Sequence, residues 1–401
     1  MRLFIAILAA LLVVSVTPRR ARAAEAGAPA ELGDDVRLLY QVVTCQTGPA
    51  LPEGLDAATV EAYCAQQRPR FQRFIEHWGK ESKEFLAPLQ PADLPSELVY
   101  PFGGGDLMMA LASFPKAEVI STISLELAGD PRRLRHVTDK TALKNSLLAI
   151  SQAGASTLMS NDSKSVNLSR IQRGELPGQL SLHLIGLMLS GFVPISARYF
   201  KVEADGSLHY YAPAEIEAME ATKAASLHKS WSSPDFSPAF ANVELRFVPA
   251  ADPNAKPRIF RHFAADLSDE GLAKYPGLLA HLEQKGKVAA MTKAASYLLW
   301  RNDFSKIRDY LVGHARFMIS DSTGVPLRFW KSAGCEVRTY GWFKAPFLGA
   351  SEAYQTELRE AYAAQPRRAL PMRFGYPDGS PDKLSHLLVT DCAPKTASPA
   401  P

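Results

Sequence analysis

The chain has 401 residues, of which 47% are hydrophobic and 21% are charged, so it can bury a large core and does not belong to the disordered class. Its 45 Lys and Arg side chains exceed its 41 Asp and Glu side chains, which gives a net charge of +4. Four of the arginines lie within residues 1–23, where there is no acidic residue, so the rest of the chain is neutral. A neutral chain has no overall field to attract nucleic acid or an anionic membrane, although a local basic patch could still do so, and nucleic acid is not predicted as a partner.

The first 23 residues have a basic start, an apolar run from Leu3 to Val16 and an Ala-x-Ala exit that ends at Ala23. These three parts are typical of a cleavable secretory signal. The run is shorter than the roughly 20 residues that a membrane-spanning helix needs, and no later uncharged stretch approaches that length. We therefore predict a signal peptide over 1–23, cleavage after Ala23, and a periplasmic or secreted mature chain with no transmembrane segment. An uncleaved N-terminal anchor is the alternative.

The chain has four cysteines: Cys45, Cys64, Cys335 and Cys392. An even number in an exported chain suggests two disulfides, and three connectivities are open. We favour Cys45 with Cys64, which closes a short loop, and Cys335 with Cys392, which would tie a late hairpin to the C-terminal strand. No Cys-x-x-Cys or His-x-His spacing occurs, so no metal site is predicted.

Periodicity and turn residues predict the elements of the first half. Residues 24–35 are rich in Ala and Gly and are predicted to be flexible. The expected elements are one or two helices within 56–86; a strand, a glycine turn, a short helix and a strand over 97–127; helices at 140–159 and 178–193; and a hairpin over 195–212 that turns at Asp205-Gly206.

The second half is predicted in the same way, after a linker or long loop over 221–241. The expected elements are strands at 241–249 and 257–268; helices at about 286–300 and 303–313; a hairpin over 315–330; a strand at 335–343; a helix at 351–364; a closing hairpin made by 370–376 and 385–391; and a flexible tail over 393–401.

Together these elements predict an α+β fold, in which a mixed or antiparallel sheet with hairpins is covered by helices. Residues 36–392 are expected to form one globular unit. Both halves run strand, helix, polar break, helix and hairpin, which suggests a duplication with lobes at 36–220 and 242–392. A cleft between such lobes would be the natural ligand site.

A glycine turn carries the strongest local signal. Gly103 to Gly105 follow a strand and precede a helix, and Glu126 ends the next strand, where a ribose-binding acid would stand. This is the outline of a nucleotide or S-adenosylmethionine site. It lacks the Gly-x-Gly-x-x-Gly spacing, and Asp106 puts a negative charge where a phosphate would sit. We therefore favour a turn with Asp106 as helix N-cap and predict no cofactor. A degenerate methyltransferase-like domain is an alternative.

Further polar residues extend from Asp303 to Arg328. We expect Asp303 to cap a helix and Asp321 to belong to a turn. A hydrolase or transferase that uses this region, or Asp106 and Glu126, is the competing class of function. The candidate binding or catalytic residues are Asp106, Glu126, Asp303, Asp321 and Arg328.

Aromatic residues gather late in the chain and could line a groove for a sugar or a peptide, although packing in a core is their commoner use. They are Trp330, Tyr340, Trp342, Phe343 and Tyr376.

The segments at 100–120, 303–330 and 372–376 resemble a family of uncharacterised exported bacterial proteins with a Tyr-Pro-Phe-x-Gly-x-Asp segment. The resemblance extends over most of residues 97–390. The family's turn reads Ser-Gly-x-Asp, so Asp106 matches whereas Gly103 replaces the serine. The resemblance implies one continuous unit in the bacterial envelope and adds no catalytic residue.

The leading hypothesis is a protein that binds a small molecule or an envelope component and has no chemistry of its own. Clustering of the five candidate residues in one pocket would favour an enzyme. Their dispersal to caps and turns would favour binding.

Overall fold

The computed structural model describes most of the chain: residues 27–160, 171, 175–176, 178–225, 237–293, 295–321, 323–343, 352–374 and 386–393. The predicted signal peptide, the predicted tail after residue 393, and Tyr376 lie outside the described residues.

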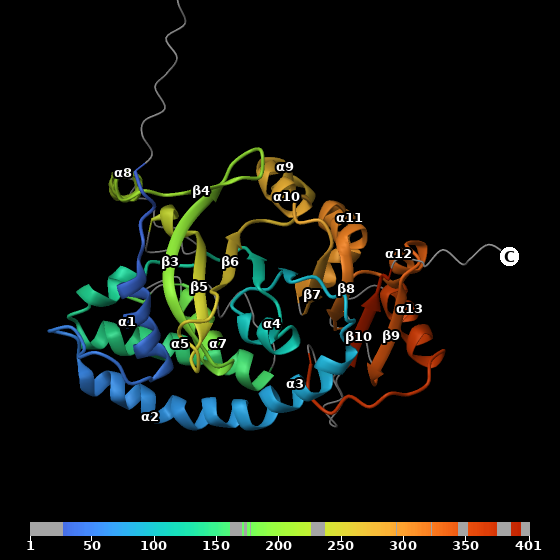
Figure 1. Cartoon of the computed structure of the whole chain (residues 1–401), viewed down its shortest axis with the longest axis horizontal. Coiled ribbons are helices and arrows are strands. Elements are labelled where there is room, and N and C mark those ends of the chain that lie inside the picture. Colours follow the sequence, from blue (N-terminus) through green and yellow to red (C-terminus); the bar gives the residue numbers. More distant parts are fainter. Residues whose placement is uncertain are drawn as a thin grey trace, which may run out of the picture.

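The described strands form one ten-stranded sheet with the order β4-β3-β5-β6-β2-β1-β7-β8-β10-β9 (Figure 1). Its central strands β6-β2-β1-β7-β8 are parallel, and antiparallel strands complete the sheet at both sides. The strands are β1 (Glu97–Pro101), β2 (Val119–Ser124), β3 (Phe192–Val202), β4 (Leu208–Tyr210), β5 (Asn242–Pro249), β6 (Arg258–Ala264), β7 (Val288–Thr292), β8 (Ala315–Ser320), β9 (Glu336–Gly341) and β10 (His386–Asp391). The predicted α+β class with a mixed sheet is confirmed.

Helices cover both faces of the sheet (Figure 1). They are α1 (Gly33–Thr44), α2 (Ala57–Phe74), α3 (Lys80–Leu86), α4 (Leu107–Ser113), α5 (Lys140–Ser160), α7 (Leu180–Leu189), α8 (Pro213–Ala225), α9 (Asp269–Lys274), α10 (Pro276–Glu283), α11 (Ser305–His314), α12 (Leu327–Ser332) and α13 (Glu352–Ala363). Strand β1 contributes side chains to the hydrophobic cores on both faces of the sheet. Leu98 and Tyr100 pack with α1, α4, α5 and α7, whereas Val99 packs with α9 to α12 on the other face.

Burial on both faces explains the composition of the central strands. Strands β1 and β2 read ELVYP and VISTIS, with few charges, because a parallel strand inside a doubly covered sheet has no solvent-facing side. The predicted strand, turn, helix and strand over 97–127 are therefore found as β1, α4 and β2. The hairpin at Asp205-Gly206 is likewise found as β3 and β4.

Three predicted elements of the second half are wrong. Residues 288–292 form strand β7 rather than the first part of a helix. Pairing with β1 on one side and β8 on the other outweighs the helical preference of Ala and Met. The predicted hairpin over 315–330 is strand β8 followed by helix α12. The predicted closing hairpin is also wrong, since β10 pairs with β8 and β9, and 370–374 is not a strand.

The ranges 36–220 and 242–392, expected as lobes, share this single sheet. Strands β1 and β7 come from different ranges and are neighbours, as are β2 and β6. Where the structure describes these ranges, no cleft separates two sheets, because the strands of the two ranges pair directly.

The stretch before α1 was expected to be flexible, but its described part is fixed to the sheet. Ala30 is buried and its amide donates to the carbonyl of Tyr211 at 2.9 Å. The amide of Leu32 donates to the carbonyl of Ala197 in β3, also at 2.9 Å. These backbone hydrogen bonds hold residues 27–32 in place, and α1 then begins at Gly33.

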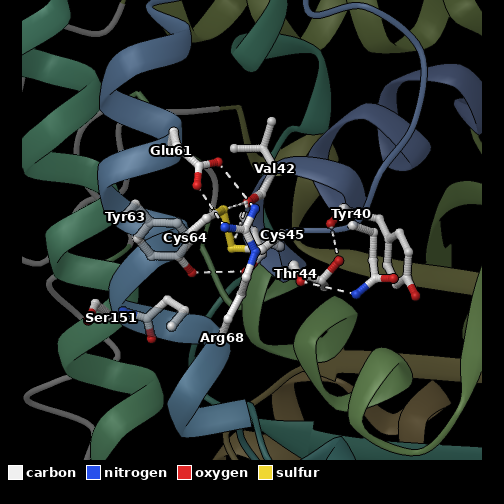
Figure 2. The surroundings of a disulfide bond; sticks show 12 residues. Tyr40, Val42, Thr44, Cys45, Glu61, Tyr63, Cys64, Arg68 and Ser151 are labelled. Carbon is white, nitrogen blue, oxygen red and sulfur yellow. Dashed lines mark hydrogen bonds and ion pairs between the residues drawn. A yellow bond between two sulfur atoms is a disulfide. The ribbon is translucent and has the colours of Figure 1, made fainter. Parts of the chain in front are cut away.

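Both favoured disulfides are present, Cys45–Cys64 and Cys335–Cys392. The first joins the end of α1 to the middle of α2, as Figure 2 shows. Beside it, the hydroxyl of Tyr63 donates to the carbonyl of Val43 at 2.9 Å. The second links the residue before β9 to the residue after β10, and so joins the edge strand β9 covalently to the neighbouring strand β10.

Among the described residues, every helix is too short or too polar to traverse a bilayer.

Candidate functional site

The topology singles out one position in the sheet. From β1 the chain crosses through α4 to β2 on one side, while β7 lies on the other side of β1. In doubly wound sheets, ligands bind outside the carboxyl ends of the strands at such a switch point. The loops that leave β1, β7 and β8 there carry Asp106, Lys293 and Asp321. With Tyr100 at the end of β1, these residues form what we call the switch-point cluster.

A buried ion pair forms the centre of the switch-point cluster. Lys293 Nζ lies 2.5 Å from Asp106 Oδ2, and the two side chains are 1% and 0% exposed. The hydroxyl of Tyr100 donates to the same carboxylate oxygen at 3.0 Å. Two groups of this protein thus contact Asp106, which lies in the loop that has the outline of a nucleotide or S-adenosylmethionine site.

Burial controls the protonation of this cluster. It raises the pKa of Asp106, against the opposing effects of the Lys293 ammonium and the Tyr100 hydroxyl. The pKa of Tyr100 is raised well above its usual value by burial first, and then by the charges of Asp106 and Asp321. Tyr100 is therefore a neutral hydrogen-bond donor at physiological pH.

The glycine turn serves close packing. A Cβ at Gly103 would lie 2.9 Å from the carbonyl oxygen of Tyr100, and one at Gly105 would lie 2.6 Å from the Leu182 side chain in α7. The amide of Gly103 donates to the carbonyl of Ile123 at 3.1 Å. Asp106 occupies the N-cap position of α4 as expected, but its carboxylate binds Lys293 and Tyr100 and makes no capping hydrogen bond.

Asp321 lies in the loop that follows β8 and is buried. Its Oδ1 accepts hydrogen bonds from the amide of Thr323, at 2.8 Å, and from the hydroxyl of the same residue. The indole of Trp300 donates to the carbonyl of Gly324 at 2.9 Å and holds the end of this loop. The turn chemistry predicted for Asp321 is present, although the turn leads into a helix rather than a strand.

Glu126 follows β2 and is also buried. The amide nitrogen of Gln179 donates to Glu126 Oε2 at 3.2 Å and to the hydroxyl oxygen of Ser124 at 3.0 Å. Glu126 therefore has a partner from this chain in the position where a ribose-binding acid was considered.

Two buried histidines pack against each other, and one of them contacts Glu126. His262 Nε2 donates to the carbonyl of Glu126 at 2.8 Å, so its Nδ1 accepts from the hydroxyl of Thr122 at 3.1 Å. His183 Nε2 donates to the carbonyl of Gly104 at 3.2 Å. The ring centroids of His183 and His262 are 5.1 Å apart. Burial lowers the pKa of His262 to about 4 and that of His183 well below 6.5, so both rings are neutral at physiological pH.

This histidine pair predicts a pH-dependent stability. A pKa lowered by folding contributes stability that is present above the unfolded value of 6.5 and is lost as the pH falls toward the folded value. Urea unfolding of the wild type is expected to show a loss of about 2 kcal/mol from His262 between about pH 7.5 and about pH 5. His262→Gln should remove this part of the slope, whereas His77→Gln, at an exposed position, should not. Equal slopes in all three proteins would contradict the assignment.

Asp303 and Arg328 are exposed and pair with residues outside the switch-point cluster. Asp303 is 51% exposed and pairs with Arg301 at 2.8 Å. It does not cap α11. Asp269 does so instead, since its Oδ1 accepts from the amide of Lys306 at 2.9 Å. Arg328 is half exposed and pairs with Glu357.

The five predicted residues divide into two kinds. Asp106, Glu126 and Asp321 are buried and follow strands β1, β2 and β8, whereas Asp303 and Arg328 make surface ion pairs. Sequence reasoning missed Lys293, which it placed inside a helix, and the two histidines, which have no motif spacing. No local signal marks these residues, because their partners come from distant strands.

The aromatic residues predicted to line a groove also lie in different parts of the structure. Trp330 and Tyr340 are buried in different cores. Trp342 and Phe343 do line a cavity of about 290 Å³ between the end of β9 and α13. A groove made by all the predicted aromatic residues is therefore not found within the described part of the chain.

Comparison of the chain with protein families, with curated proteins and with solved structures found no match. Within the described residues, no group of three or more His, Cys, Asp and Glu side chains could hold a metal ion.

Proposed function

We propose that this chain is an exported binding protein whose nucleotide-type crevice is closed by its own side chains. The observation that carries the proposal is the buried pair of Asp106 and Lys293 at the carboxyl ends of β1 and β7. A cofactor at the switch point would have to displace Lys293, and the buried carboxyl group of Asp106 would lose the cation that it pairs with. Such an exchange costs several kcal/mol, so the crevice is a poor cofactor site.

Catalysis at the switch-point cluster is disfavoured for the same reason. A general acid or base needs contact with a substrate. Asp106 and Lys293 contact each other instead and are almost fully buried. The two exposed candidates, Asp303 and Arg328, form ordinary surface ion pairs. The dispersal favours binding over a hydrolase or transferase.

The strand order favours one form of the proposal, a degenerate methyltransferase-like domain. Numbered along the chain within the parallel core, the strands β6-β2-β1-β7-β8 have the order 3-2-1-4-5 of doubly wound nucleotide-binding sheets. Strand β10 then runs antiparallel between β8 and β9 and ends the parallel part of the sheet at this side. The likeness to nucleotide-binding sheets is one of strand order alone. The proposal that cofactor binding has been lost rests on the ion pair of Asp106 and Lys293 at the switch point.

Export is part of the proposal. Two disulfides are typical of proteins outside the cytoplasm, and the apolar start of the chain has the pattern of a secretory signal. The resemblance to exported bacterial proteins supports a periplasmic or secreted location. An unidentified small molecule or envelope component remains the proposed partner.

Calorimetric titration of the purified mature protein with S-adenosylmethionine, S-adenosylhomocysteine, NAD and ATP tests the proposal. We expect no saturable heat from any of them. A working methyltransferase titrated with S-adenosylmethionine in the same buffer shows that the ligand is intact. A Kd below about 100 μM, which corresponds to about 5.5 kcal/mol of binding free energy, would refute a closed crevice.

A further inference from the structure

A second site lies at the edge of the sheet, far along the chain from the glycine turn. The cavity of about 290 Å³ opens between the end of β9 and the C-terminal half of α13. It is lined by Thr339, Gly341, Trp342, Phe343, Arg359, Tyr362, Ala363, Arg367 and Arg368. Its volume is at the lower end of the range for small-molecule sites, which is roughly 300–1,000 Å³.

The lining combines flat aromatic rings with positive charge. Three of the described lining residues are arginines, and none of the described ones is an aspartate or glutamate. The guanidinium carbon of Arg367 lies 4.5 Å from the ring centroid of Trp342. Phe343 and Tyr362 add a second aromatic surface, with ring centroids 5.8 Å apart. The cavity therefore offers apolar walls and hydrogen-bond donors that favour a negative charge.

Backbone and side-chain hydrogen bonds fix the walls in place. The hydroxyl of Tyr362 lies 3.2 Å from the carbonyls of both Tyr340 and Leu387. Gln365 donates to the carbonyl of Val337 at 2.9 Å, and the amide of Gly341 donates to the carbonyl of Arg368 at 2.9 Å. The segment after α13 is thus tied along β9. A wall that is already ordered loses little conformational entropy when a ligand binds.

We propose that this cavity binds a small organic anion with a planar apolar body, such as an aromatic carboxylate. Guanidinium groups donate hydrogen bonds and accept none, so they match a carboxylate better than a neutral sugar, which needs both. The flat body would lie against Trp342 and Phe343. The inference rests on the proposed binding function and names the class of ligand, and it places the site away from the switch-point cluster.

Calorimetric titration with 2-naphthoate, a rigid carboxylate of suitable size, tests the site. We expect saturable binding with a Kd of about 0.1–1 mM, in line with about 0.4 kcal/mol per non-hydrogen atom. The neutral amide of the same ring, 2-naphthamide, should bind at least about tenfold more weakly, because it lacks the charge. Arg367→Gln should weaken 2-naphthoate about tenfold, and Trp342→Leu about three- to tenfold.

Arg246→Gln is the matched control, because Arg246 is exposed on β5 and does not line the cavity. It should leave the affinity unchanged. Near-ultraviolet circular dichroism of each variant checks that the fold is retained. Absence of 2-naphthoate binding, equal affinity for the amide, or equal weakening by Arg246→Gln and Arg367→Gln would overturn the assignment. Such a result leaves the closed crevice intact, whereas binding of S-adenosylmethionine would overturn the crevice and not this cavity.

Discussion

Replacing Lys293 with methionine is expected to lower the free energy of unfolding by about 3–5 kcal/mol. The side chain of methionine fills similar space, but it leaves the Asp106 carboxylate with no cation in a site that is 0% exposed. Urea denaturation, followed by circular dichroism at neutral pH, measures the change. Asp106→Asn should have a comparable cost, because it removes the charge that pairs with the buried Lys293 ammonium.

The double variant Asp106→Asn/Lys293→Met is the control for this prediction. It removes both charges and should recover most of the loss, since a buried ion pair contributes little net stability over an uncharged pair of similar volume. Losses that simply add in the double variant would contradict a direct interaction between the two side chains.

Removing the Cys335–Cys392 disulfide by replacing both residues with alanine is expected to cost about 4 kcal/mol. The bridge spans 57 residues, so its loss restores much conformational freedom to the unfolded chain. It also removes the covalent link between the edge strand β9 and its neighbour β10. The measurement is urea unfolding of the oxidised wild type and the double-alanine variant under the same conditions.

The Cys45–Cys64 disulfide provides the comparison, because its two residues are only 19 apart. The same replacement there is expected to cost about 3 kcal/mol. A cost below about 1 kcal/mol for the 57-residue bridge would show that the unfolded chain does not gain the expected freedom.

Local sequence patterns predicted the elements that local chemistry controls. The path from Glu97 to Ser124 was predictable because an apolar strand, a run of glycines and a set of helix formers follow one another. The turn at Asp205-Gly206 was predictable for the same reason, since Gly206 has φ +87°. Both disulfides could be paired by proximity in the sequence.

Elements that depend on distant partners could not be predicted in this way. Residues 288–292 form a strand because β1 and β8 flank them, and nothing within the segment reports those neighbours. The same error hid Lys293, whose role depends on Asp106 in a loop from the other half of the chain. Asp106 was recognised as a charge unsuited to a phosphate site, which is consistent with its buried pair, but its partner required the tertiary structure.

The most direct test of a closed crevice is a crystal structure of the mature protein grown with saturating S-adenosylmethionine. We expect that Lys293 Nζ still contacts the Asp106 carboxylate and that no adenosyl group lies over Gly103 to Gly105. Density for the cofactor between the ends of β1 and β7, with Lys293 moved away from Asp106, would contradict it.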